Sequence, residues 1–119
     1  MLEKKIHSFK NAWRGVMTAW LEELNFRIEL GLALIVVVAA YLVGIDRVEW
    51  LMLAFAIGLV LMAETFNTAL EELCDKYQSE HDPHIAKIKD LAAGAVFIAV
   101  TTASVIGAAI FIPHILAQL

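Results

Sequence analysis

The chain has 119 residues, 61% of them hydrophobic, and its mean hydropathy is +0.73, whereas soluble domains have about 45–50% apolar residues. These values exclude an ordinary soluble domain and predict a single membrane domain, residues 1–119. The net charge of −4 comes from side chains outside three apolar stretches, so no basic face predicts a nucleic-acid partner.

Residues 6–26 carry apolar side chains at helical spacing, with charged side chains off that stripe. The stripe consists of Ile6, Phe9, Trp13, Val16, Met17, Trp20 and Leu24. We expect an amphipathic helix on the membrane surface, where indole rings prefer to lie. The alternative is a soluble helix packed on another domain, but the chain has no soluble domain to be covered.

Three apolar stretches predict three transmembrane helices, at residues 28–46, 48–72 and 90–117. The uncharged run from Trp50 to Ala63 is too short to cross alone, because crossing takes about 30 Å at 1.5 Å per residue. The second helix must therefore continue through Glu64 and Asn67, and it carries a carboxylate into or near the membrane.

The distribution of Lys and Arg predicts the orientation of the chain. Five precede the first span, three lie in a polar connector at residues 76–90, and only Arg47 lies in the turn between the first two spans. Cytoplasmic segments carry the excess of these residues, so the N-terminus and the connector are expected in the cytoplasm. No cleavage site follows a short apolar core near the start, so the spans themselves are expected to target the chain to the membrane.

Four polar residues form one stripe on the second predicted helix. Glu64, Asn67, Glu71 and Asp75 are separated by three, four and four residues, which places them within an arc of about 80°. Glu71 and Asp75 alone would be solvated residues at a helix end. A carboxylate at the depth of Glu64 costs about 2.5 kcal/mol or more and is a functional hypothesis by default. The stripe therefore indicates either polar contacts between helices or a reacting site.

Other charged residues are expected at the same membrane interface. Glu22, Glu23 and Glu29 surround the start of the first span, and Lys89 and Asp90 lie at the start of the third. Carboxylate oxygens suit Mg²⁺ and lysine suits phosphate, and a deeper carboxylate could take a proton from a lipid hydroxyl.

Common nucleotide and metal motifs are missing from the sequence. It contains no glycine-rich phosphate loop, and its four histidines lack zinc-site spacing. The single Cys74 excludes an internal disulfide and is expected to be a packing residue.

The sequence resembles the prokaryotic diacylglycerol kinase family in four segments. They are A-E-T-F-N-T-A-L-E-E-L-C-D (63–75), A-K-I-K-D-L-A-A-G-A-V (86–96), S-F-K-N-A-W-R-G (8–15) and E-L-N-F-R-I-E (23–29). The resemblance implies a homotrimer of three-span protomers in the bacterial cytoplasmic (inner) membrane. It also implies active sites at subunit contacts and direct transfer of the ATP γ-phosphate to a lipid alcohol.

The same resemblance implies roles for individual residues. Glu64 corresponds to the base that takes the hydroxyl proton, and Asn67 supports the base and orients the acceptor. Glu23 and Glu71 correspond to ligands of Mg²⁺, which is bound with the nucleotide. The nucleotide-contacting positions are matched by Glu80, Lys89 and Asp90, and the lipid side is lined by Arg27 and Glu29.

Short segments that differ between branches of this family predict which lipid is the substrate. The N-F-R segment, the Glu49-Trp50 pair and the A-A-G-A-V start of the third span resemble more closely the branch that phosphorylates undecaprenol. Ala93 stands where some members have serine, and Met17 where members often have a basic residue. Undecaprenol is therefore expected ahead of diacylglycerol.

Two other functions are compatible with parts of the pattern. A small proton-coupled exporter could use one buried glutamate, but it would need neither the acidic stripe at the interface nor Lys89-Asp90. A structural protein that oligomerises through Ala92, Gly94, Gly107 and Ala108 would explain the small residues, but not Glu64.

Overall fold

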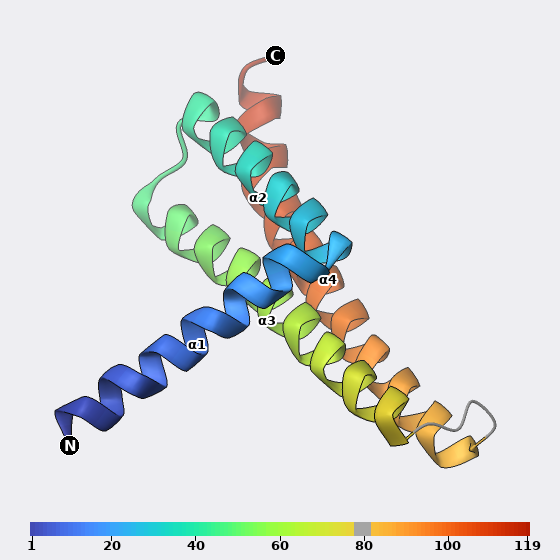
Figure 1. Ribbon diagram of the computed structural model, residues 1–119. Helices are drawn as coiled ribbons and strands as arrows, with labels where there is room; N and C mark the ends of the chain where they lie inside the picture. The colour runs from blue at the N-terminus through green and yellow to red at the C-terminus, as the bar shows by residue number, and fades with distance from the viewer. Residues whose placement is uncertain (78–81) are drawn as a thin grey trace.

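The computed structural model describes residues 1–77 and 82–119. These residues form four helices, α1 (Leu2–Glu22), α2 (Leu24–Val43), α3 (Arg47–Tyr77) and α4 (Pro83–Ala117). Figure 1 shows α2, α3 and α4 packed as a bundle, with α3 antiparallel to the other two, while α1 projects away from it. The described part contains no strand, and α2, α3 and α4 are each long and apolar enough to cross a membrane. The predicted all-α membrane fold with an amphipathic N-terminal helix is confirmed.

The three bundle helices differ in length. At about 1.5 Å per residue, the 20 residues of α2 span about 30 Å, close to the hydrocarbon thickness of a bilayer. The helices α3 and α4 have 31 and 35 residues and extend well beyond the start of α2 (Figure 1). The joint between α1 and α2 therefore lies beside the middle of α3.

Backbone conformation and side-chain caps set the turn between α2 and α3. Gly44 adopts a left-handed conformation with φ of 81°, and its amide donates to the carbonyl of Ala40 at 3.0 Å. Glycine adopts this conformation without steric cost, and it ends α2 three residues before the predicted end of the span. At the start of α3, the Asp46 side chain accepts from the Glu49 amide at 2.9 Å and the Glu49 side chain accepts from the Asp46 amide at 3.1 Å. This reciprocal pair is a capping box.

In the predicted polar connector at residues 76–90, the described residues 76–77 and 83–90 are helical, so both helices extend beyond the predicted spans 48–72 and 90–117. The helix α3 continues to Tyr77, and α4 begins at Pro83. Proline is favourable at the first helical position, where its missing N–H has no helical partner to lose. Asp82 caps the helix by accepting from the His84 amide at 2.8 Å. Pro83 thus occupies the first position of α4.

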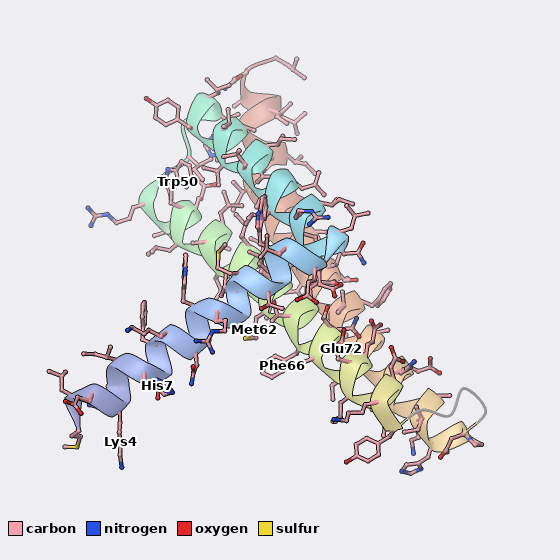
Figure 2. The ribbon with its side chains drawn as sticks, viewed as in Figure 1. Lys4, His7, Trp50, Met62, Phe66 and Glu72 are labelled. Atoms are coloured by element: carbon pink, nitrogen blue, oxygen red, sulfur yellow. The ribbon has the colours of Figure 1, made fainter. Side chains whose placement is uncertain are left out.

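The helix α1 exposes its apolar stripe. Phe9, Trp13 and Trp20 are all exposed in the protomer, as expected for a helix whose apolar face contacts lipid. Lys4 and His7 lie on the part of α1 farthest from the bundle (Figure 2). The helix ends at Glu22, before the predicted residue 26, because Glu23 is extended.

The largest buried cluster lies at the bundle end that holds the α2–α3 turn. It joins Ala40, Ile45, Leu53 and Ile110 from α2, the turn, α3 and α4. Cys74 is a free, buried thiol near the other end, which confirms that it is a packing residue. The hydrophobic core and the polar stripe therefore occupy opposite halves of the bundle.

Candidate functional site at the polar end of the bundle

The four residues of the predicted polar stripe lie on successive turns of α3 and differ in burial. Glu64 is only 7% exposed, Asn67 is half-buried, and Glu71 and Asp75 are exposed. The stripe therefore runs from the interior of the bundle to the exposed C-terminal end of α3. Figure 2 shows Phe66 and Glu72 along the same stretch of α3.

Glu64 lies next to a second acidic residue. Its carboxyl group is close enough to that of Glu29 on α2 to interact electrostatically. Glu29 is five residues after the start of α2, or about 8 Å along its axis, so Glu64 lies near the level at which α2 begins. Oε2 of Glu29 is buried and has no hydrogen-bond partner in the described part of the chain. The two carboxyl groups form an acidic pair on facing helices.

An apolar cavity of about 370 Å³ begins at Glu29 and runs between α2, α3 and α4. Its lining includes Leu61 near the Glu29 end and Leu53 and Phe111 toward the core end, with Ser104 as a further polar residue. A cavity with a carboxyl group at one end and hydrocarbon walls matches an amphipathic ligand that has one polar head.

Asn67 contacts Glu71. Its Nδ2 donates to Oε1 of Glu71 at 3.3 Å, whereas the resemblance had assigned Asn67 to the support of Glu64. Oδ1 of Asn67 is buried and has no partner among the described residues. This orientation leaves an amide oxygen and a carboxylate on neighbouring turns of α3.

Lys89 on α4 forms an ion pair with Asp75 on α3, with 2.6 Å between Nζ and Oδ1. Lys89 also lies within electrostatic reach of Glu71. The structure therefore brings a predicted phosphate-binding lysine to the predicted metal-binding carboxylate. Asp75 was recognised as part of the stripe, but its role as the partner of Lys89 depends on the packing of α3 on α4 and was missed.

The remaining predicted site residues lie apart from this group. Glu23 is half-buried at the α1–α2 joint, and Arg27 donates from Nη1 to the carbonyls of Trp20 and Leu21. Asp90 lines a depression formed by α4 alone. Glu80 lies outside the described residues.

The oxygen donors near Glu71 fit the chemistry of Mg²⁺. The described residues contain no group of three or more His, Cys, Asp or Glu side chains that could enclose a metal ion. Magnesium is usually held by one or two carboxylates together with water and substrate phosphates. Glu71 and the free Oδ1 of Asn67, with Lys89 nearby for phosphate, are compatible with that mode.

Comparisons with known proteins identify the family of this chain. The family profile described as "Prokaryotic diacylglycerol kinase" matches residues 10–111. The chain is 37% identical over 110 residues to a diacylglycerol kinase of Synechocystis sp., which covers 92% of this chain and 63% of that longer protein. It is 32% identical to the undecaprenol kinase of Bacillus subtilis, over 96% of this chain and 93% of that protein. It is 33% identical to the diacylglycerol kinase of Escherichia coli K12, over 77% and 75%.

These matches decide between the predicted functions. The profile covers residues on all four helices, and the relatives are named as lipid kinases, so the exporter and the purely structural protein gain no support. The family implies ATP as co-substrate, and with the three apolar helices it indicates an integral inner-membrane protein. The chain belongs to the prokaryotic diacylglycerol kinase family and is a lipid kinase, as its sequence predicted.

Proposed function

We propose that this protein transfers the γ-phosphate of ATP, with Mg²⁺, to the hydroxyl group of a membrane lipid alcohol, with undecaprenol preferred to diacylglycerol. The observation that carries the proposal is the buried Glu64 beside the unpartnered Oε2 of Glu29, at one end of an apolar cavity. This arrangement offers a proton acceptor for the hydroxyl group of a lipid alcohol and an apolar cavity for its hydrocarbon chain.

On the lipid side, Glu64 acts as the general base. Its carboxylate takes the single proton of the acceptor hydroxyl as the oxygen attacks the γ-phosphorus, and ADP leaves as the bond between the β- and γ-phosphates breaks. The Glu29 carboxyl group lies beside this base on the lipid side. The apolar chain occupies the cavity between α2, α3 and α4. Arg27 borders the lipid side at the start of α2.

On the nucleotide side, Lys89 binds phosphate and Asp75 holds Lys89 in place. Glu71 and Glu23 are the proposed metal ligands, and Asn67 orients the Glu71 carboxylate through its amide. When bound, Mg²⁺ neutralises phosphate charge during the transfer. Protein side chains supply most of the remaining effect by positioning the reactants.

A homotrimer with shared sites is part of the proposal. Asp90 follows Lys89 directly, but it lines a depression formed by α4 alone, whereas Lys89 reaches α3. For Asp90 to contact the nucleotide, a neighbouring subunit of the trimer must cover this face of α4. The proposed site therefore combines Lys89 and Glu71 of one protomer with residues of the next.

The preference for undecaprenol rests on two observations. The chain and the undecaprenol kinase of Bacillus subtilis match over nearly their full lengths, and the segments around Phe26, Trp50 and Gly94 resemble the undecaprenol branch. The greater identity to the Synechocystis protein argues for diacylglycerol. A direct comparison of the two lipids is therefore the decisive test.

The experiment measures transfer of labelled γ-phosphate from ATP by the purified protein in lipid nanodiscs, with undecaprenol and diacylglycerol supplied separately. We expect a higher kcat/KM for undecaprenol and a loss of about 10²-fold or more in kcat for Glu64→Gln, which removes a general base. Glu72→Gln changes an exposed carboxylate next to the stripe and serves as the matched control. Full activity of Glu64→Gln would refute the base, and a preference for diacylglycerol would refute the substrate assignment.

A further inference from the structure

The joint between α1 and α2 depends on few contacts. The chain changes direction at Glu23, whose φ of −110° and ψ of 110° are extended. Ala19 and Phe26, on either side of this residue, are the buried side chains of the joint. The rest of α1 projects away from the bundle (Figure 1), so its orientation is set at the joint.

Arg27 connects the two helices across this joint. One guanidinium nitrogen, Nη1, donates to the carbonyl of Trp20 at 2.9 Å and to that of Leu21 at 3.1 Å. Both carbonyls belong to the last turn of α1, where no following helical amide is available to donate to them. The Arg27 amide also donates to the carbonyl of Glu23 at 3.3 Å. The amide bond is the usual one of a first helical turn, whereas the Arg27 side chain ties the start of α2 to the end of α1.

We infer that Arg27 is a positioning residue that holds the α1–α2 joint, and thereby the Glu23 carboxylate, in its functional orientation. This inference rests on the proposed role of Glu23 as a metal ligand. It differs from a role for Arg27 in lipid binding, because the atoms that Arg27 contacts are backbone carbonyls of α1. A planar guanidinium can serve two carbonyls and keep other donors free.

The inference predicts two separate effects of Arg27→Gln. The amides of residues 20–27 lose protection because, without the Arg27 side chain, the end of α1 is no longer tied to α2 and the joint opens more often. Metal affinity falls because Glu23 is no longer held in one orientation, while the KM for the lipid changes little. Lipid binding by Arg27 would give the opposite kinetic result, a higher lipid KM with unchanged metal affinity.

The test applies hydrogen exchange with mass spectrometry to the full-length protein in nanodiscs. We expect faster exchange in peptides covering residues 20–27 of Arg27→Gln, with exchange in α3 and α4 unchanged. Arg47→Gln is the matched control, because Arg47 is exposed and no side-chain hydrogen bond joins it to another described residue. Unchanged exchange at the joint in Arg27→Gln would overturn the inference.

Metal binding is measured separately by electron paramagnetic resonance. The signal of free Mn²⁺ decreases as the ion binds to the protein in the presence of a non-hydrolysable ATP analogue. We expect Arg27→Gln to weaken Mn²⁺ binding about threefold to tenfold, a difference of up to about 1.4 kcal/mol, and Arg47→Gln to leave it unchanged. Glu23→Gln separates the two hypotheses. If Glu23→Gln binds Mn²⁺ normally, the proposed metal site is wrong. If Glu23→Gln weakens binding and Arg27→Gln does not, the positioning role is wrong.

Discussion

Lys89 and Asp75 form an ion pair that positions the Lys89 side chain and contributes little to folding. Their side chains are 40% and 67% exposed, and exposed pairs contribute only about 0–1 kcal/mol to folding. The pair nevertheless fixes a long, flexible lysine side chain beside Glu71. Its contribution is therefore expected in nucleotide binding and not in stability.

We predict that Asp75→Asn raises the KM for ATP about threefold to tenfold, up to about 1.4 kcal/mol, because Lys89 must then be ordered by the nucleotide itself. The free energy of unfolding is expected to change by less than about 1 kcal/mol. Steady-state kinetics with varied ATP, and reaction of the buried Cys74 thiol with a maleimide dye during denaturation, measure the two quantities. Glu72→Gln, which removes a neighbouring charge outside the stripe, should change neither. An unchanged ATP KM in Asp75→Asn would contradict the positioning of Lys89.

At the scale of the helices, Gly44 determines where α2 ends. A Cβ atom built on Gly44 would meet no other atom within 4 Å, so substitution there tests the backbone conformation alone. We predict that Gly44→Ala lowers the free energy of unfolding by about 1–2 kcal/mol, the cost of a left-handed L-residue. Gly44→Asn should cost less, because asparagine tolerates this region. The free energy of unfolding of both variants is measured through the reactivity of the Cys74 thiol during denaturation. An equal decrease in Gly44→Ala and Gly44→Asn would contradict this explanation.

The ends of α3 and α4 distant from the polar stripe are joined through Glu49. Its carboxylate contacts Nε2 of His114 at 3.0 and 3.2 Å and also caps the start of α3. We predict that Glu49→Ala lowers the free energy of unfolding, since a helix cap and a contact between helices are both lost. Glu49→Gln keeps an acceptor and should lose less. The contact lies far from Glu64 along α3. We therefore expect kcat, measured below the unfolding temperature, to be unchanged in both variants. A lower kcat would show that this contact affects activity as well as stability.

Periodicity and hydropathy were sufficient to predict the helices, but not all of their boundaries. The length of the apolar runs predicted three spans, and the spacing of Glu64, Asn67, Glu71 and Asp75 predicted one face of α3. The charges between residues 76 and 90 indicated a polar connector but not the helix that starts within it, although Asp82 and Pro83 form a good helix start. The contacts of Glu29 with Glu64 and of Lys89 with Asp75 join different helices, so they depend on packing that no local pattern specifies.

At the scale of the whole molecule, α3 and α4 extend past α2 on the side of the polar stripe. The α2 helix alone is about 30 Å long, enough to cross the hydrocarbon, so the additional turns of α3 and α4 lie beyond the membrane core. These turns carry Glu71, Asp75 and Lys89, the residues proposed to face ATP. Soluble ATP and membrane lipid can therefore meet near Glu64 only if this end of the bundle faces the cytoplasm.

The orientation can be tested with single cysteines, because the native Cys74 is buried and should react little with a maleimide that cannot cross membranes. Lys5→Cys and Lys87→Cys are expected to be protected in intact spheroplasts and to react after permeabilisation, since Lys and Arg concentrate in these segments. Arg47→Cys and Leu119→Cys lie at the opposite end of the bundle (Figure 1) and should react in both states. The unsubstituted chain measures the background from Cys74. Labelling of Lys87→Cys in intact spheroplasts would place the nucleotide side outside the cell, where the proposed use of cytoplasmic ATP is impossible.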